Sequence, residues 1–244
     1  MNLNINKNEP VMVTGATGFI ASWLVKKLID NGITVHAAVR NTDDSIKLAH
    51  LKNLENGSSG KIIFFKSDLL EDGSYLEAME GCSTVFHTAS PFNFSVTDNK
   101  KGFIDPAFIG TQNVLKSVNN TESVKRVVLT SSCAAIYGDA ADIAMYPGQV
   151  MTEEMWNTSS TETHNAYSYS KTIAEKEAWD ISKKQTRWKL VVVNPCFVLG
   201  PSISKNPTSG TFELISQLAD GSMKSGAAPF EIGAVDVKDV AEAH

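Results

Sequence analysis

Tyr167 and Lys171 stand four positions apart in the stretch "YSYSKTIAEKEAWD", which covers residues 167–180. Residues four positions apart share one face of a helix, so the phenol and the ammonium project together while Tyr169 points elsewhere. A phenol with a pKa near 10 needs a neighbouring positive charge to exchange its proton at neutral pH. The spacing suits an acid–base pair, although Tyr–Lys pairs also occur on plain solvated helices.

A serine pair, Ser131 and Ser132, follows the apolar run "RVVLT". Serines at the end of a strand usually cap a helix or a turn, and that alternative stands for this pair taken alone. Two other reactive residue types are interpreted as packing residues. His87 lies inside an apolar strand pattern, and Cys196 has no evident histidine partner nearby to activate its thiol.

The segment "VTGATGFIASWL" joins the first apolar run to the first amphipathic stretch. Gly15 permits a tight turn, Gly18 lets the backbone approach a pyrophosphate, and the small Ala21 lets helix and strand pack closely. The amino end of the following helix offers free N–H groups to phosphate oxygens. We therefore predict a dinucleotide site here, with a glycine-rich turn that binds nothing as the alternative.

The residue at the end of the second strand pattern distinguishes between dinucleotides. An NAD site usually has an acidic residue there, and this chain has Arg40. A guanidinium can bind a 2′-phosphate through two hydrogen bonds, and Lys47 in the next helix adds positive charge. The pattern favours NADP, unless Arg40 is a surface residue paired with Asp43 or Asp44.

Two further strand ends offer cofactor contacts. Asp68 and Leu69 end the third strand pattern, where the Asp68 carboxylate can accept a hydrogen bond from the adenine amine. Thr88, Ala89 and Ser90 end the fourth, where small side chains leave room for the ribose and the pyrophosphate.

The composition of the 244-residue chain is ordinary for a globular protein, with 42% hydrophobic and 20% charged residues. A net charge of −5 disfavours nucleic acid as a partner. The three cysteines form no CxxC pair, so we expect no metal site and no disulfide framework. The polar amino terminus and the lack of an apolar run of about eighteen residues disfavour secretion and membrane insertion. We expect a cytoplasmic protein.

Apolar runs alternate with amphipathic stretches along the chain. The expected strands are residues 11–15, 33–39, 61–65, 83–90, 126–132 and 189–195, and the expected helices are 19–30, 45–54, 74–81, 106–118 and one from 167. Apolar strands separated by helices predict an α/β fold with a doubly wound parallel sheet of the Rossmann type. We expect an NADP-binding domain over residues 1–200. Residues 201–244 would begin a substrate-binding lobe, too short to be complete.

The sequence resembles the extended branch of the short-chain dehydrogenase/reductase superfamily. Within that branch it is similar to the dihydroflavonol reductase, cinnamoyl-CoA reductase and aldehyde (methylglyoxal) reductase group. The resemblance covers nearly all of the chain and rests on eight segments in order: "VTGATGFIAS", "AAVRN", "SDLLEDGSY", "VFHTASP", "GTQNVLKS", "RVVLTSS", "YSYSK" and "NPCFVLGP". Two positions depart from the pattern. Ala21 replaces a third glycine, and Ala107 stands where other branches have an asparagine in a proton relay.

The resemblance implies a catalytic triad of Ser132, Tyr167 and Lys171. Tyr167 would donate a proton to a carbonyl oxygen, Ser132 would hold that oxygen, and Lys171 would stabilise the phenolate and hold the nicotinamide ribose. The full set of expected NADP contacts is Gly15, Thr17, Gly18, Phe19, Ile20, Arg40, Lys47, Asp68, Leu69, Thr88, Ala89, Ser90, Thr130, Tyr167, Lys171, Asn194, Pro195, Cys196 and Val198.

These residues predict NADPH-dependent reduction of an aldehyde or ketone to the alcohol by a monomer or weak homodimer. Two alternatives stay open. An NAD-dependent sugar-nucleotide epimerase or dehydratase would share the fold and the Tyr–Lys pair, but an acidic residue in place of Arg40 would favour it. A non-catalytic dinucleotide sensor would usually lack Tyr167 or Lys171. The substrate wall is expected in residues 91–96 and 134–156.

Overall fold

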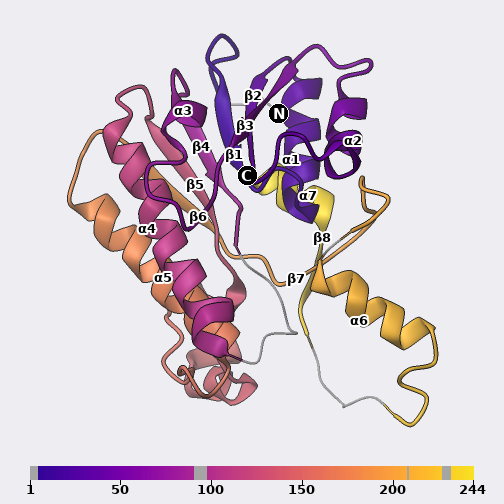
Figure 1. Ribbon diagram of the computed structural model, residues 1–244. Helices are drawn as coiled ribbons and strands as arrows, with labels where there is room; N and C mark the ends of the chain where they lie inside the picture. The colour runs from indigo at the N-terminus through magenta and orange to yellow at the C-terminus, as the bar shows by residue number, and fades with distance from the viewer. Residues whose placement is uncertain (1–4, 91–97, 208, 227–231) are drawn as a thin grey trace.

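The computed structural model describes residues 5–90, 98–207, 209–226 and 232–244 (Figure 1). Its main sheet has six parallel strands: β1 (Val11–Thr14), β2 (Thr34–Val39), β3 (Lys61–Lys66), β4 (Thr84–His87), β5 (Arg126–Thr130) and β6 (Lys189–Val193). Their spatial order is β3-β2-β1-β4-β5-β6, so the winding reverses between β1 and β4. This is the doubly wound order, and the Rossmann-type prediction is confirmed.

Helices cover both faces of this sheet (Figure 1). One face packs against α1 (Phe19–Asp30) and α2 (Ser45–Leu54), and the other against α3 (Leu76–Met79), α4 (Asp105–Asn120) and α5 (Ala166–Lys183). The central strands β1 and β4 are buried along their whole lengths, whereas the edge strands β3 and β6 have exposed positions. Each predicted strand and helix occurs, but α3 has four residues where a helix over 74–81 was expected.

The chain leaves the main sheet after β6. β7 (Phe197–Leu199) pairs with β8 (Ala234–Asp236) in a separate two-stranded sheet, and α6 (Gly210–Ala219) projects away from the main sheet (Figure 1). α7 (Val237–Ala243) returns to pack on α1, where Lys27 and Glu242 form an ion pair. The Trp23 indole also donates a hydrogen bond to the Pro201 carbonyl at 2.8 Å. The division into two domains stays a prediction. In the described ranges, no helix combines the length and the apolar character that a membrane span requires.

A close backbone approach joins the end of α1 to the start of β3 at Gly60. The Gly60 N–H donates to the Ile29 carbonyl at 2.8 Å. A Cβ atom on Gly60 would lie 2.3 Å from the Ile33 carbonyl oxygen and 2.7 Å from the Ile29 Cα. Both are backbone atoms that cannot rotate away, so this contact requires glycine.

We expect Gly60→Ala to lower the free energy of unfolding by about 3 kcal/mol, the upper end for overpacking, because backbone must move. Gly57→Ala is the matched control. A Cβ there meets nothing within 4 Å, so that variant carries only the strain of its φ of 90°, about 1 kcal/mol. Urea unfolding of the two variants and the parent measures the difference, and equal losses would contradict the close approach.

Candidate active site

The carboxyl ends of the parallel strands bring most of the predicted site residues to one edge of the main sheet. The winding reverses between β1 and β4, and doubly wound sheets bind their ligands outside the strand ends at such a reversal. The expected phosphate turn follows β1, Arg40 follows β2, and the serine pair follows β5. The geometry at each strand end decides what it can bind.

The turn between β1 and α1 has a backbone shaped for a phosphate group. Gly15 has a φ of 59°, and a Cβ there would lie 3.0 Å from the Ala89 Cβ. The Gly18 N–H donates to the Gly15 carbonyl at 2.8 Å, and α1 begins at the next residue, Phe19. No described side chain caps this helix, and its first turn holds no acidic residue. Its first N–H groups are therefore open to an anion.

Thr14 fixes the end of β4 against β1. Its hydroxyl oxygen accepts hydrogen bonds from the N–H groups of Thr88 at 3.1 Å and Ala89 at 2.9 Å. The same oxygen lies 3.0 Å from Nδ1 of His87, a fully buried side chain. Burial, together with the smaller effect of the nearby Lys171 charge, lowers the pKa of His87 to about 3. His87 is therefore the neutral core residue that the sequence predicted.

Arg40 is exposed directly after β2. Asp44, one of its possible partners, instead accepts a hydrogen bond from the Lys47 N–H at 3.0 Å and lies 3.8 Å from the Lys47 Nζ. Among the described ion pairs, Asp44 is thus paired with Lys47, and none includes Arg40, which is an exposed residue. Binding of a 2′-phosphate by Arg40 and Lys47 stays a prediction.

Asp68 and Leu69 form a tight turn after β3. Oδ1 of Asp68 accepts a hydrogen bond from the Leu70 N–H at 2.9 Å, and the Leu69 carbonyl accepts one from the Asn113 amide at 2.9 Å. Gly110 of α4 lies so close to this turn that a Cβ atom added there would overlap the Leu69 side chain. Contacts from α4 therefore hold this turn, and a role for Asp68 at adenine stays a prediction.

Ser132 lies between the end of β5 and Tyr167. Its Oγ accepts a hydrogen bond from the Ala134 N–H at 3.2 Å and caps a short 3₁₀ helix (Cys133–Ala135), so the capping role considered from the sequence is real. The same hydroxyl interacts with the Tyr167 phenol. On α5, the Lys171 Nζ lies 5.9 Å from the centre of the Tyr167 ring. The serine, the phenol and the ammonium therefore share one small region.

Burial moves the pKa values of the phenol and the ammonium in opposite directions. It raises the pKa of Tyr167 to about 12, although the Ser132 side chain acts against the rise. It lowers the pKa of Lys171 to about 8, although the Glu175 carboxylate acts against the fall. At pH 7 the phenol holds its proton, while the lysine is charged and close to titrating. Shifts caused by desolvation next to specific partners are characteristic of functional sites.

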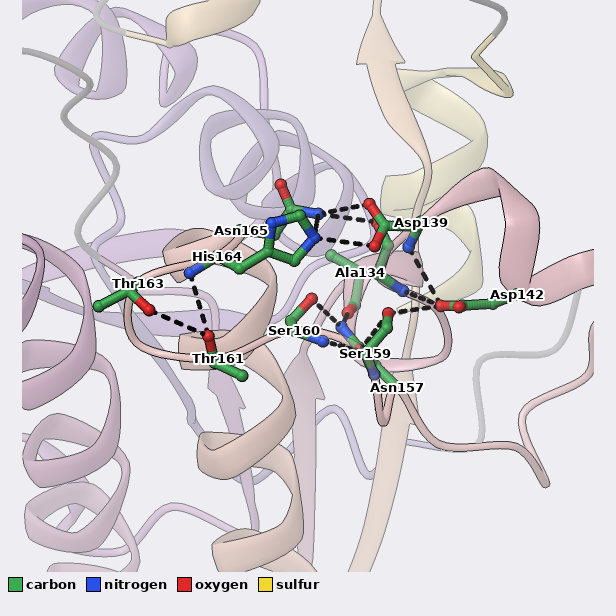
Figure 2. Close-up of polar contacts among 11 residues, drawn as sticks. Ala134, Asp139, Asp142, Asn157, Ser159, Ser160, Thr161, Thr163, His164 and Asn165 are labelled. Atoms are coloured by element: carbon green, nitrogen blue, oxygen red, sulfur yellow. Dashed lines mark hydrogen bonds and ion pairs between the residues drawn. The ribbon is translucent and has the colours of Figure 1, made fainter.

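A polar network holds the segment that precedes α5 (Figure 2). Asp139 Oδ2 lies 2.8 Å from His164 Nε2, and Asp139 Oδ1 accepts a hydrogen bond from the Asn165 amide at 2.9 Å. Asn165 has a φ of 54° and directly precedes the helix. Tyr167 is the second residue of α5, so this network fixes the turn that carries the phenol.

A family model described as the NAD dependent epimerase/dehydratase family matches residues 11–244. The chain belongs to this family. Cinnamoyl-CoA reductase CAD2 of Medicago truncatula is 40% identical over 242 residues, which are 98% of this chain and 72% of that protein. The resemblance to extended short-chain reductases is therefore confirmed.

Two solved structures of reductases have the same fold. Yeast methylglyoxal/isovaleraldehyde reductase Gre2, in complex with NADPH, gives a TM-score of 0.82 at 30% identity, over 96% of this chain and 72% of that one. Vestitone reductase of alfalfa (Medicago sativa L.) gives 0.74 at 30% identity, over 97% and 71%. Structures of this epimerase/dehydratase family thus match the arrangement of the described elements.

The segment after β6 packs against the backbone of Ser132 and Cys133. The Asn194 amide donates to the Ser132 carbonyl at 3.1 Å, and the Pro195 carbonyl accepts a hydrogen bond from the Cys133 N–H at 3.0 Å. Val198 lies further along, in β7, and is buried in a cluster that Phe19 and Ile20 join. Contacts of Asn194, Pro195, Cys196 and Val198 with a nicotinamide stay predictions.

A small cavity of about 20 Å³ lies beside Lys171. It is lined in part by His87, Ser90, Ala107, Thr111, Thr130, Ser131, Lys171 and Glu175. The Thr130 hydroxyl lies 2.6 Å from Nε2 of His244. Residues 91–96, expected in the substrate wall, lie outside the described residues. The described part of the chain contains no cluster of three or more His, Cys, Asp or Glu side chains that could hold a metal.

Sequence reasoning missed two features of this site. Glu175 lies four positions after Lys171, on the same helical face, and that spacing was a usable signal. A second network centres on Asn157, whose amide donates to the Ser160 hydroxyl at 2.8 Å, and on Asp142, which accepts a hydrogen bond from the Ser159 hydroxyl at 2.6 Å (Figure 2). Its partners Ser159 and Ser160 belong to an irregular segment without periodicity, so no sequence pattern predicts these contacts.

The left-handed conformation of Asn165 yields a test of how the start of α5 is held. Asn165→Gly keeps this conformation available and loses the amide, whereas Asn165→Ala also forces a Cβ-bearing residue without a polar side chain into it. We expect Asn165→Ala to lose about 1 kcal/mol more unfolding free energy than Asn165→Gly. Urea unfolding measures both, and an alanine variant as stable as the glycine variant would contradict the strain.

Proposed function

We propose that this chain is an NADPH-dependent reductase that converts an aldehyde or a ketone to the alcohol. The observation that carries the proposal is the meeting of Ser132, Tyr167 and Lys171 beside the carboxyl edge of a doubly wound sheet, where the glycine turn also lies. The reductases to which the chain is similar support it, one of them solved with NADPH.

The described residues fit a dinucleotide phosphate. The open N–H groups at the start of α1 suit the pyrophosphate, and the exposed Arg40 after β2 suits a 2′-phosphate. The bound cofactor would supply the hydride. Holding the nicotinamide ribose is the role we assign to the Lys171 ammonium, as the resemblance implies.

The chain's own residues would handle the proton and the charge on the substrate oxygen. Tyr167, protonated at neutral pH, would donate its phenolic proton to the carbonyl oxygen. Ser132 would hold that oxygen by a hydrogen bond and stabilise its developing charge. Lys171 would stabilise the phenolate that remains, because an ammonium nearby favours the charged form of the phenol.

The family description also favours one alternative, an NAD-dependent epimerase or dehydratase. The exposed Arg40 argues against it, because NAD sites usually have an acidic residue there. A sensor without activity is the other alternative, and turnover of any carbonyl compound would exclude it. A cytoplasmic location and a monomeric or weakly dimeric state stay predictions.

We expect the chain to bind NADPH at least about tenfold more tightly than NADH, and Arg40→Ala to erase most of that preference. The lost contact is a charge-assisted hydrogen bond, worth about 1.5–3 kcal/mol. Arg126→Ala is the matched control, because Arg126 is the first residue of β5 and so lies at the amino ends of the parallel strands, away from the carboxyl ends. Calorimetric titration of both cofactors measures the ratio, and equal affinities in the unmodified chain would favour the NAD-dependent alternative.

We expect Tyr167→Phe to lower the rate of carbonyl reduction about 10²–10⁴-fold, the usual contribution of general acid catalysis, with NADPH affinity nearly unchanged. The ring keeps its edge contact with Phe103 and loses the donor. Tyr169→Phe, two residues along the same helix, is the matched control and should retain full activity. NADPH oxidation with a panel of aldehydes and ketones provides the readout. A Tyr167→Phe variant with more than about a tenth of the parent rate would move proton donation to another group.

A further inference from the structure

Glu175 is a buried carboxylate one helical turn after Lys171 on α5. The residue is only 6% exposed to solvent. A carboxylate this far from water is stable only with hydrogen bonds or an opposite charge. Oε2 accepts a hydrogen bond from the Asn194 amide at 2.8 Å, and Oε1 accepts one from the Trp179 indole at 3.3 Å. The carboxylate is therefore fixed in place from two sides.

Lys171 is 8% exposed and lines the same cavity of about 20 Å³ as Glu175. A cavity of this size has room for about one water molecule. His87 faces the cavity from β4 and is neutral, because burial lowers its pKa to about 3. The other side chains that face it come from the segment after β4, from α4, from the end of β5 and from Ala174 of α5, and they carry no charge. Among the described cavity residues, Glu175 is the acidic one, and its charge acts on the Lys171 ammonium across the cavity.

Asn194 extends the influence of Glu175 to the serine. Its amide nitrogen donates both to Glu175 Oε2 and to the Ser132 carbonyl, the latter at 3.1 Å. The carboxylate thus anchors an amide that touches the backbone of Ser132, while its charge acts on Lys171 from one turn away. The buried Glu175 side chain therefore acts on Lys171 through its charge and on Ser132 through Asn194.

We propose that Glu175 is a positioning residue that keeps the Lys171 ammonium charged and holds Asn194 against the Ser132 backbone. The inference rests on the proposed reductase function for its catalytic meaning. Its electrostatic part concerns the side chains of this chain alone, so it can be tested without cofactor or substrate.

Titration of Lys171 tests the electrostatic part directly. The ammonium is charged below its pKa of about 8 and neutral above it, and Glu175 raises that pKa. Removing the carboxylate favours the neutral amine, so the titration must move to lower pH. We expect Glu175→Gln to move it by about one pH unit or more, and Glu175→Asp by less, because aspartate keeps the charge farther away. NMR of the cofactor-free chain labelled at the lysine ε-carbons, with Lys171→Arg to assign the signal, measures each midpoint.

The matched control is Glu177→Gln, which removes the same charge from the same helix. Glu177 accepts a hydrogen bond from Gln112 of α4 at 2.9 Å and does not line the cavity. We expect its Lys171 midpoint to equal that of the parent. A folded Glu175→Gln variant with an unshifted midpoint would overturn the inference. If that variant fails to fold, Glu175→Asp decides in its place, because a midpoint equal to the parent's there has the same meaning.

The pH dependence of carbonyl reduction links the charge to catalysis. Phenolate stabilisation requires charged Lys171, so the rate should fall as pH rises through about 8 in the parent. In Glu175→Gln this fall should begin at lower pH by the shift that NMR gives, whereas a purely structural role would lower the rate equally at all pH values. An equal loss at all pH values would overturn the catalytic part. A parent chain that reduces no carbonyl compound would overturn the proposed function, while the NMR titration would still decide the charge effect.

Discussion

Double coverage of the parallel sheet is the constraint on which the rest of this structure depends. β1 and β4 are buried along their entire lengths, so side chains there must be apolar or carry satisfied polar groups. The hydroxyl of Thr14 meets this demand by binding two backbone N–H groups of the neighbouring strand end. Polar chemistry is thereby confined to the strand ends, where the winding reversal between β1 and β4 opens space.

Placing a lysine at this edge has an electrostatic cost that the surroundings must offset. Desolvation disfavours the ammonium of Lys171, and a second cation nearby would disfavour it further. His87 avoids that conflict because burial keeps it neutral. Glu175 contributes the opposite charge, and its own burial is compensated by hydrogen bonds from Asn194 and Trp179. The charge at the site is thus the outcome of several buried groups rather than of the Tyr–Lys pair alone.

The sequence predicted features that follow local periodicity and missed those made by irregular segments. The doubly wound parallel sheet and the glycine turn follow from apolar runs and from glycines at fixed positions, and the strands were predicted within a few residues. The ends of α3 were not, because a four-residue helix leaves little periodicity to detect. Glu175 had the right spacing to Lys171 and to Trp179 on its own helix, but its partner Asn194 lies outside that helix. Asn194, which donates a hydrogen bond to its carboxylate, directly follows β6, and this tertiary contact has no local signature.

Burial explains why the Tyr167 phenol and the Lys171 amine suit the different tasks that we propose for them. Burial is the chief cause of both pKa shifts, because desolvation disfavours whichever form is charged. It therefore raises the pKa of Tyr167 and lowers the pKa of Lys171. Tyr167, which we propose as the proton donor, is therefore protonated at neutral pH, and Lys171, for which we propose the role of a cation, lies near its titration point. Such an arrangement makes the site sensitive to any nearby charge. Glu175, one helical turn from Lys171, raises the pKa of the ammonium, and through that charge it would influence the chemistry that we propose for the phenol.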